Sequence, residues 1–163
     1  LNFCLNFFRC IFYPIAKAHE LYLDESIVLI HDGVRPLVDV DTIEKCIAYS
    51  LEKGNAITVS PATETVALMS ENGNVGKILP RSICQMAKAP QCFKLGDIYH
   101  NHLKAQEEGL NDFIDSASLM QHYGTELYTV EGPSENIKIT TPGDFYIFRA
   151  IVDARENSQI FGL

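Results

Sequence analysis

The stretch that decides the fold is Ile27-Val28-Leu29-Ile30-His31-Asp32-Gly33-Val34-Arg35-Pro36. Its four consecutive aliphatic residues are typical of a strand that is buried on both faces inside a parallel sheet. Gly33 and Pro36 break this pattern, so we expect Asp32 and Arg35 at the carboxyl edge of the strand, where open α/β sheets bind ligands. A carboxylate and a guanidinium three residues apart suit one metal ion and one phosphate. A salt bridge at the strand tip, or an Asp that caps a turn, explains this stretch equally well.

The surrounding pattern of helices and strands predicts an α/β fold. Asp39 or Asp41 can cap a helix that runs to Lys53 and stops at Gly54, and residues 56–59 form a second strand. A strand, a helix and a strand within this length make a right-handed βαβ unit. We expect further helices over 16–23, 93–109, 115–122 and after Thr141, and further strands over 126–130 and 136–139.

Residues 64–80 predict a β-hairpin. Residues 65–68 and 75–78 flank Glu71-Asn72-Gly73-Asn74, and Asn-Gly strongly favours a hairpin turn. Because this segment has few apolar residues of its own, we expect an arm that projects from the body and needs a partner surface.

Length and composition fit one globular domain. The chain has 163 residues, of which 47% are hydrophobic, and a formal net charge of −8 without a Lys/Arg cluster argues against a nucleic-acid partner. Residues 1–15 are apolar but too short to span a bilayer, and they lack a cleavage site, so neither a membrane span nor a signal peptide is predicted. Five cysteines without a C-x-x-C pair indicate reduced thiols and a cytoplasmic location. His100 and His102 would point to different faces of a helix, so we expect no metal role for them.

Lys138 is the second candidate for a phosphate-binding residue. It comes shortly before a predicted helix whose N-cap is Thr141, with Pro142 at the first helical position and Asp144 at the third. A helix N-terminus with free N–H groups favours anions. A lysine that alternates outward from a strand into solvent is the alternative, and it is the more common case.

Six motifs, in the same order and spacing, resemble the polyol-phosphate cytidylyltransferases, the family of the methylerythritol-phosphate and ribitol-phosphate enzymes. They are His31–Pro36, Pro61-Ala62-Thr63-Glu64-Thr65, Pro80-Arg81-Ser82, Ala89-Pro90-Gln91-Cys92-Phe93, Asp115-Ser116-Ala117-Ser118 and Glu135–Pro142. The resemblance covers roughly residues 24–153. It implies a Rossmann-like nucleotidyltransferase fold, with 1–163 as the C-terminal part of one cytidylyltransferase domain and 64–80 as a β-arm for dimerisation.

The resemblance also implies transfer of CMP from CTP to 2-C-methyl-D-erythritol 4-phosphate or D-ribitol 5-phosphate, with release of pyrophosphate. Catalytic roles would fall on Asp32, Lys138 and Arg35, with Asp32 also holding Mg²⁺ against the α-phosphate of CTP. Thr65, Arg81 and Asp115 would bind the acceptor substrate. Thr65 and Arg81 would do so in the partner's site, because family members form homodimers by exchanging the arm. Two anions meet in this reaction, so catalysis is mostly positioning and charge neutralisation.

Three departures from the family pattern affect these expectations. No glycine precedes Gly33, so the Gly-rich loop with which the family begins is missing here. We therefore expect that the record begins too late, and that the chain as given lacks CTP-dependent activity. Ala89 and Ile114 stand where the family has threonine, which weakens the case for methylerythritol phosphate as the acceptor.

Two other functions stay open from the sequence. One is a shortened, catalytically dead homologue that acts as a dimerisation or regulatory module. The other is a nucleotidyltransferase that activates a hexose phosphate, although Pro90-Gln91 and Asn136-Ile137-Lys138 favour cytidylyl transfer.

Overall fold

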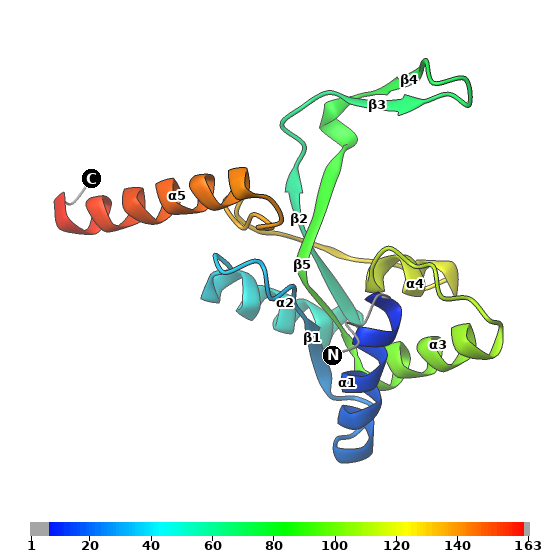
Figure 1. The fold of residues 1–163 in the computed structure, drawn as a ribbon. Coiled ribbons are helices and arrows are strands. Elements are labelled where there is room, and N and C mark those ends of the chain that lie inside the picture. The colour runs from blue at the N-terminus through cyan, green and yellow to red at the C-terminus, as the bar shows by residue number, and fades with distance from the viewer. Residues whose placement is uncertain (1–6, 162–163) are drawn as a thin grey trace.

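The computed structural model describes residues 7–161 and is built on one four-stranded sheet and one separate hairpin (Figure 1). Its elements are α1 (Phe7–Leu21), β1 (Ile27–Ile30), α2 (Val40–Lys53), β2 (Asn55–Pro61), β3 (Val66–Met69), β4 (Val75–Leu79), η1 (Arg81–Ile83), β5 (Gln85–Lys94), α3 (Leu95–Glu107), α4 (Ser116–His122), β6 (Thr129–Glu131) and α5 (Pro142–Phe161). Within the described residues, no helix is both long and apolar enough to cross a membrane.

The sheet has the strand order β1-β5-β2-β6. β5 runs antiparallel to both β1 and β2, whereas β6 runs parallel to β2. The expectation that residues 27–30 form a strand buried on both faces of a parallel sheet is therefore wrong, because β1 is only half-buried and pairs antiparallel. β1 and β2 do run in the same direction, but β5 lies between them, so the predicted βαβ unit spans a third strand.

The central strand β5 was not predicted from the sequence. A helix was expected from Phe93, but the strand continues to Lys94 and the helix starts at Leu95. Pro90 argued against a central strand because proline cannot donate to the ladder. Here the Ala89–Pro90 peptide is cis, the register against β2 shifts beside it, and the Thr58 hydroxyl donates to the Pro90 carbonyl at 2.7 Å.

Helix starts and stops were predicted better than strand pairing. Asp39 caps α2 by accepting from the Thr42 N–H, Gly54 ends it at φ 94°, and Asp115 starts α4 with a capping box. α5 begins at Pro142, as the sequence predicts. The strand predicted over 126–130 is shorter and later (Thr129–Glu131), and residues 136–139, predicted as a strand, form a loop.

Alternate residues of β5 face two different layers of the core. Cys92 packs with Cys46 of α2 and Ala56 of β2, whereas Phe93 packs with Ile98 of α3 and Ile15 of α1. The described part of the segment 1–15 is thus an amphipathic helix and not an unpatterned stretch, and residues 1–6 lie outside the described residues. The two layers leave the carboxyl end of β1 open on one side of the sheet.

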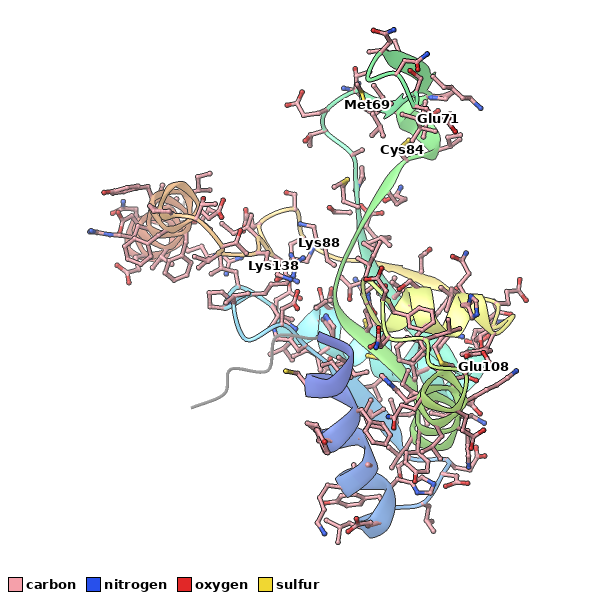
Figure 2. All side chains as sticks on the ribbon, turned by 45° about the vertical axis from the view of Figure 1, so that its right-hand side comes forward. Met69, Glu71, Cys84, Lys88, Glu108 and Lys138 are labelled. Atoms are coloured by element: carbon pink, nitrogen blue, oxygen red, sulfur yellow. The ribbon has the colours of Figure 1, made fainter. Side chains whose placement is uncertain are left out.

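Two elements extend from this body. β3 and β4 pair only with each other within the described chain and form the predicted hairpin, which projects far from the sheet, while α5 extends in another direction (Figures 1 and 2). Several arm residues present large apolar side chains to solvent, namely Leu68, Met69, Val75 and Ile78. The use of this arm in dimerisation stays a prediction.

Candidate active site

Asp32 lies directly beyond β1 and meets two cations. Its Oδ2 is 2.9 Å from Nε of Arg35 and 3.4 Å from Nζ of Lys138. The turn is closed by the Arg35 N–H, which donates to the Asp32 carbonyl, and His31 Nε2 lies 2.9 Å from the Arg35 carbonyl. The tip salt bridge considered from the sequence is therefore present. Lys138 adds a second cation from a segment far along the chain, so it is not merely a solvated lysine.

The electrostatics of this cluster keep Asp32 ionised. Burial by itself raises the pKa of the Asp32 carboxyl, but the hydrogen bond from Arg35 and the charge of Lys138 outweigh it, and the pKa falls below its ordinary value. A carboxylate that stays charged at the edge of a sheet is suited to a divalent cation.

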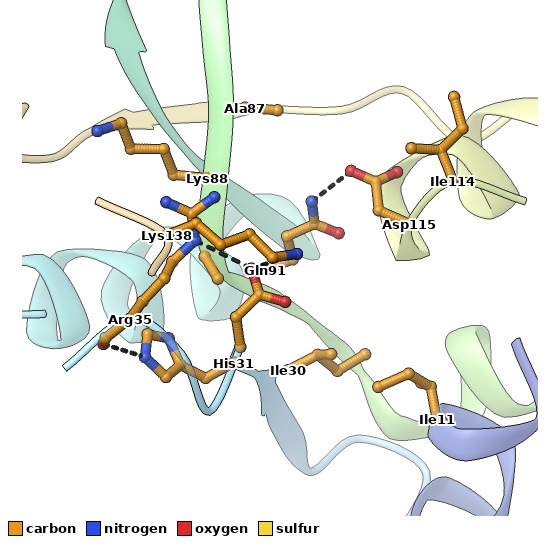
Figure 3. A pocket seen from close by; sticks show the side chains of 12 residues that line it. Ile11, Ile30, His31, Arg35, Ala87, Lys88, Gln91, Ile114, Asp115 and Lys138 are labelled. Atoms are coloured by element: carbon orange, nitrogen blue, oxygen red, sulfur yellow. Dashed lines mark hydrogen bonds and ion pairs between the residues drawn. The ribbon is translucent and has the colours of Figure 1, made fainter. Parts of the chain in front are cut away.

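The cluster lines a cavity of about 400 Å³ at the sheet edge (Figure 3). Its wall combines three cations and two carboxylates with apolar side chains, and it is formed by Ile11, Ile30, His31, Asp32, Arg35, Ala87, Lys88, Ala89, Gln91, Ile114, Asp115 and Lys138. Ala89 and Ile114, the two positions where the family motif has threonine, both belong to this wall. Their side chains offer the cavity no hydroxyl.

Asp115 is also at the cavity, but its oxygens hold the structure together. Oδ1 accepts from the Ser118 N–H at 2.8 Å, and Oδ2 accepts from Nε2 of Gln91 at 2.8 Å. Gln91 Oε1 accepts in turn from the Ala117 N–H, so the start of α4 is fixed to β5. The expected substrate contact of Asp115 stays a prediction beside this capping role.

Thr65 and Arg81 lie on the arm and are not among the residues that line the cavity. Arg81 donates through Nη1 to the Thr63 carbonyl at 3.2 Å, at the base of the arm. Within one chain, the structure therefore brings Asp32, Arg35, Lys138 and Asp115 together but leaves Thr65 and Arg81 apart from them.

Asp32 fits the way in which proteins bind Mg²⁺. This ion often takes one or two carboxylates together with substrate phosphates and keeps several waters. Asp32 offers one carboxylate at the cavity, and both of its ion pairs use Oδ2. Among the described residues, no group of three or more His, Cys, Asp and Glu gathers that could form a separate all-protein metal site.

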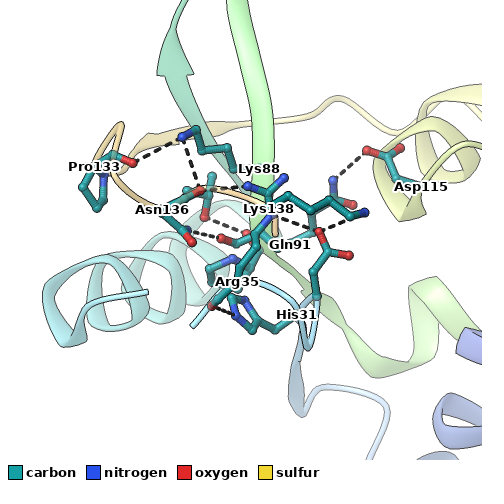
Figure 4. Close-up of polar contacts among 12 residues, drawn as sticks. His31, Arg35, Lys88, Gln91, Asp115, Pro133, Asn136 and Lys138 are labelled. Carbon is teal, nitrogen blue, oxygen red and sulfur yellow. Dashed lines mark hydrogen bonds and ion pairs between the residues drawn. The ribbon is translucent and has the colours of Figure 1, made fainter. Parts of the chain in front are cut away.

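Lys88 is the cavity residue that sequence reasoning missed. It lies on β5 one residue before Ala89, and its Nζ donates to the Ser134 carbonyl at 2.8 Å (Figure 4). Because residues 85–92 were not expected to form a strand, the direction of this side chain could not be predicted.

The fold and this sheet-edge cluster define an α/β protein of the nucleotidyltransferase kind. Residues 16–154 match the family described as IspD, 2-C-methyl-D-erythritol 4-phosphate cytidylyltransferase. The match covers most of the chain, so the protein belongs to this family.

Named relatives include both branches of the family. A ribitol-5-phosphate cytidylyltransferase of Streptococcus agalactiae is 47% identical over 153 residues, which are 94% of this chain and 64% of the relative. A 2-C-methyl-D-erythritol 4-phosphate cytidylyltransferase of Clostridium acetobutylicum is 39% identical over 121 residues, 74% of this chain and 52% of the relative. The chain thus spans less than two thirds of the length of these relatives.

A solved structure supports the fold. The 4-diphosphocytidyl-2C-methyl-D-erythritol synthase of Anaerococcus prevotii superposes with a TM-score of 0.78 at 25% identity, over 86% of this chain and 62% of the other.

The lowered pKa of Asp32 predicts how stability depends on pH. Since its folded-state pKa lies below the model value of 3.8, the ionised form stabilises the fold above about pH 4, and this contribution is lost as the pH falls through the lower folded pKa. Urea unfolding of the native chain and of Asp32→Asn should differ in free energy at pH 6, and the difference should shrink below about pH 3.8. Lys138→Met should lose part of the same pH-dependent difference. A difference that is constant from pH 6 to pH 3 would contradict these ion pairs.

Proposed function

We propose that the protein is a cytidylyltransferase that transfers CMP from CTP to a polyol phosphate, with D-ribitol 5-phosphate as the preferred acceptor. The observation that carries the proposal is the meeting of Asp32, Arg35 and Lys138 at one cavity, because these residues belong to two family motifs far apart in the sequence. The higher identity to the ribitol-5-phosphate relative than to the methylerythritol one supports the acceptor. The apolar Ala89 and Ile114 in the cavity wall support it too.

In the proposed reaction, an oxygen of the acceptor phosphate attacks the α-phosphorus of CTP, and pyrophosphate leaves with the electrons of the broken P–O bond. Mg²⁺ held by Asp32 would neutralise charge on the reacting phosphates. Lys138, whose ammonium lies 3.4 Å from the Asp32 carboxylate, would contact the same phosphates, and Arg35 would hold Asp32 in place through its 2.9 Å hydrogen bond. The side chains would thus supply positioning and positive charge. The free thiols among the described cysteines support a cytoplasmic location.

Pyrophosphate release tests the proposed function. The chain spans 64% of the Streptococcus agalactiae relative, so the assay is run on the chain itself and on a chimaera that adds the Gly-rich-loop segment of that relative in front of it. With CTP and Mg²⁺, the chimaera should turn over ribitol 5-phosphate at least about tenfold more efficiently than methylerythritol phosphate. The unextended chain should release none.

Two variants of the chimaera complete this experiment. Asp32→Asn should lower turnover by roughly a hundredfold or more, because an amide binds Mg²⁺ far more weakly than a carboxylate. Asp112→Asn, an exposed change outside the cavity wall, is the matched control. Equal turnover by Asp32→Asn and the control would refute the role of Asp32, and a preference for methylerythritol phosphate would refute the assigned acceptor.

We propose further that the arm over 64–80 crosses a two-fold interface in a homodimer. The arm exposes apolar residues on strands that pair only with each other in the described chain, and it carries Thr65 away from the cavity of its own chain. Arg81 follows directly after it. Each site would then combine Asp32 and Lys138 of one subunit with Thr65 and Arg81 supplied by its partner.

Mixing two inactive variants of the chimaera tests the shared site. Asp32→Asn and Arg81→Ala place both lesions in one site of a mixed dimer and leave the other site intact. Random exchange of equal amounts should restore roughly a quarter of the native activity, by counting sites under two-fold symmetry. If mass spectrometry shows subunit exchange and no activity returns, all four residues act within one subunit and the proposal fails.

A further inference from the structure

Lys88 is a half-buried cation that binds main-chain oxygens. Its Nζ lies 2.8 Å from the Ser134 carbonyl, 3.3 Å from that of Asn136 and 3.5 Å from that of Pro133. Figure 4 shows the ammonium reaching from β5 to this loop. None of the ion pairs found among residues 7–161 gives Lys88 a carboxylate partner. The three carbonyl oxygens are thus its partners at the cavity.

This arrangement has an energetic cost that calls for a function. Burial, together with the nearby charge of Arg35, lowers the pKa of the Lys88 ammonium, so the charged form is disfavoured there. Hydrogen bonds from a charged donor to carbonyl oxygens offset that cost. They also place a positive charge against three oxygens whose partial negative charge would otherwise repel a phosphate in the cavity.

The same loop is held a second time, from the residue next to Lys88. The buried amide of Asn136 donates through Nδ2 to the Ala89 carbonyl at 2.7 Å. Arg35 Nη1 donates to the Asn136 carbonyl at 2.8 Å, and the Ile139 N–H donates to the Val34 carbonyl at 2.9 Å. Residues 133–139 therefore have a fixed conformation without belonging to a strand.

We infer that Lys88 is a positioning residue of the active site: it fixes the loop 133–136 against β5 and thereby holds Lys138 opposite Asp32. The inference rests on the proposed function for the role of Lys138, but the hold on the loop is a property of the chain itself. Lys88 acts through Lys138, and its own ammonium is occupied by carbonyl oxygens and makes no phosphate contact.

The experiment uses the chain itself with two readouts. Amide hydrogen exchange at Ile139 reports on the loop, and calorimetric titration with Mg²⁺ and inorganic pyrophosphate reports on the phosphate site. Lys88→Met keeps the apolar stem and removes the ammonium, Lys88→Arg keeps a charged donor, and Lys53→Met at the exposed end of α2 is the matched control. Each Lys88 variant is also made together with Lys138→Met.

Lys88→Met should speed exchange at Ile139 and weaken pyrophosphate binding, each by roughly tenfold, the size of one lost charge-assisted hydrogen bond. Lys88→Arg and Lys53→Met should leave both within about threefold of the native chain. In the Lys138→Met background, Lys88→Met should still speed exchange but should weaken binding no further, because its effect on the ligand passes through Lys138.

Three outcomes would overturn the inference or separate it from the proposed function. Unchanged exchange in Lys88→Met refutes the hold on the loop. Fully additive losses of affinity show that Lys88 contacts the phosphate itself and refute the positioning role. If the native chain binds no pyrophosphate, the proposed phosphate site fails in this chain, and the exchange result alone then decides whether Lys88 holds the loop.

Discussion

The guanidinium of Arg35 joins two parts of the chain on which the whole site depends. Its Nε donates to Asp32 at the end of β1, and its Nη1 donates to the carbonyl of Asn136, 101 residues further along. Only 11% of this side chain is exposed, so both bonds are shielded from water and stronger than on an open surface. Lys138 follows Asn136 by two residues and meets the same carboxylate. Without this bridge, the acid and the lysine would belong to unrelated segments.

The site concentrates positive charge in a chain that is acidic overall. The formal net charge is −8, yet Arg35, Lys88 and Lys138 all line one cavity. Two of these cations donate to main-chain carbonyls, which keeps them in the cavity wall without a carboxylate neutralising each of them. A polyanion such as a nucleoside triphosphate would meet a local field that the net charge of the protein does not reveal.

The parts of the fold that could be predicted were those encoded locally. Asp39, Asp115 and Thr141 start helices through contacts within one turn, and the Asn-Gly pair gave the hairpin. The strand pairing could not be predicted, because β5 contains Pro90 and lies between two strands that precede it in the sequence. Residues 136–139 have the composition of a strand, but side chains of Arg35 and Lys88 bind the carbonyl of Asn136 where a neighbouring strand would.

The site was predicted to a similar extent and for similar reasons. Asp32 and Arg35 could be placed because they follow a strand directly, and Lys138 because it precedes a helix start. Lys88 depends on β5, so it could not be found. Thr65 and Arg81 lie on an arm that leaves its own chain's cavity, and their contacts are a matter of how two chains meet.

A crystal structure of the protein with CMP and Mn²⁺ tests the central claim most directly, because the anomalous signal of manganese locates the ion without ambiguity. The account predicts manganese on the Asp32 carboxylate, with the nucleotide phosphate between the metal and Nζ of Lys138. A phosphate bound elsewhere, or manganese on Asp115 with Asp32 still paired only to Arg35 and Lys138, would contradict it.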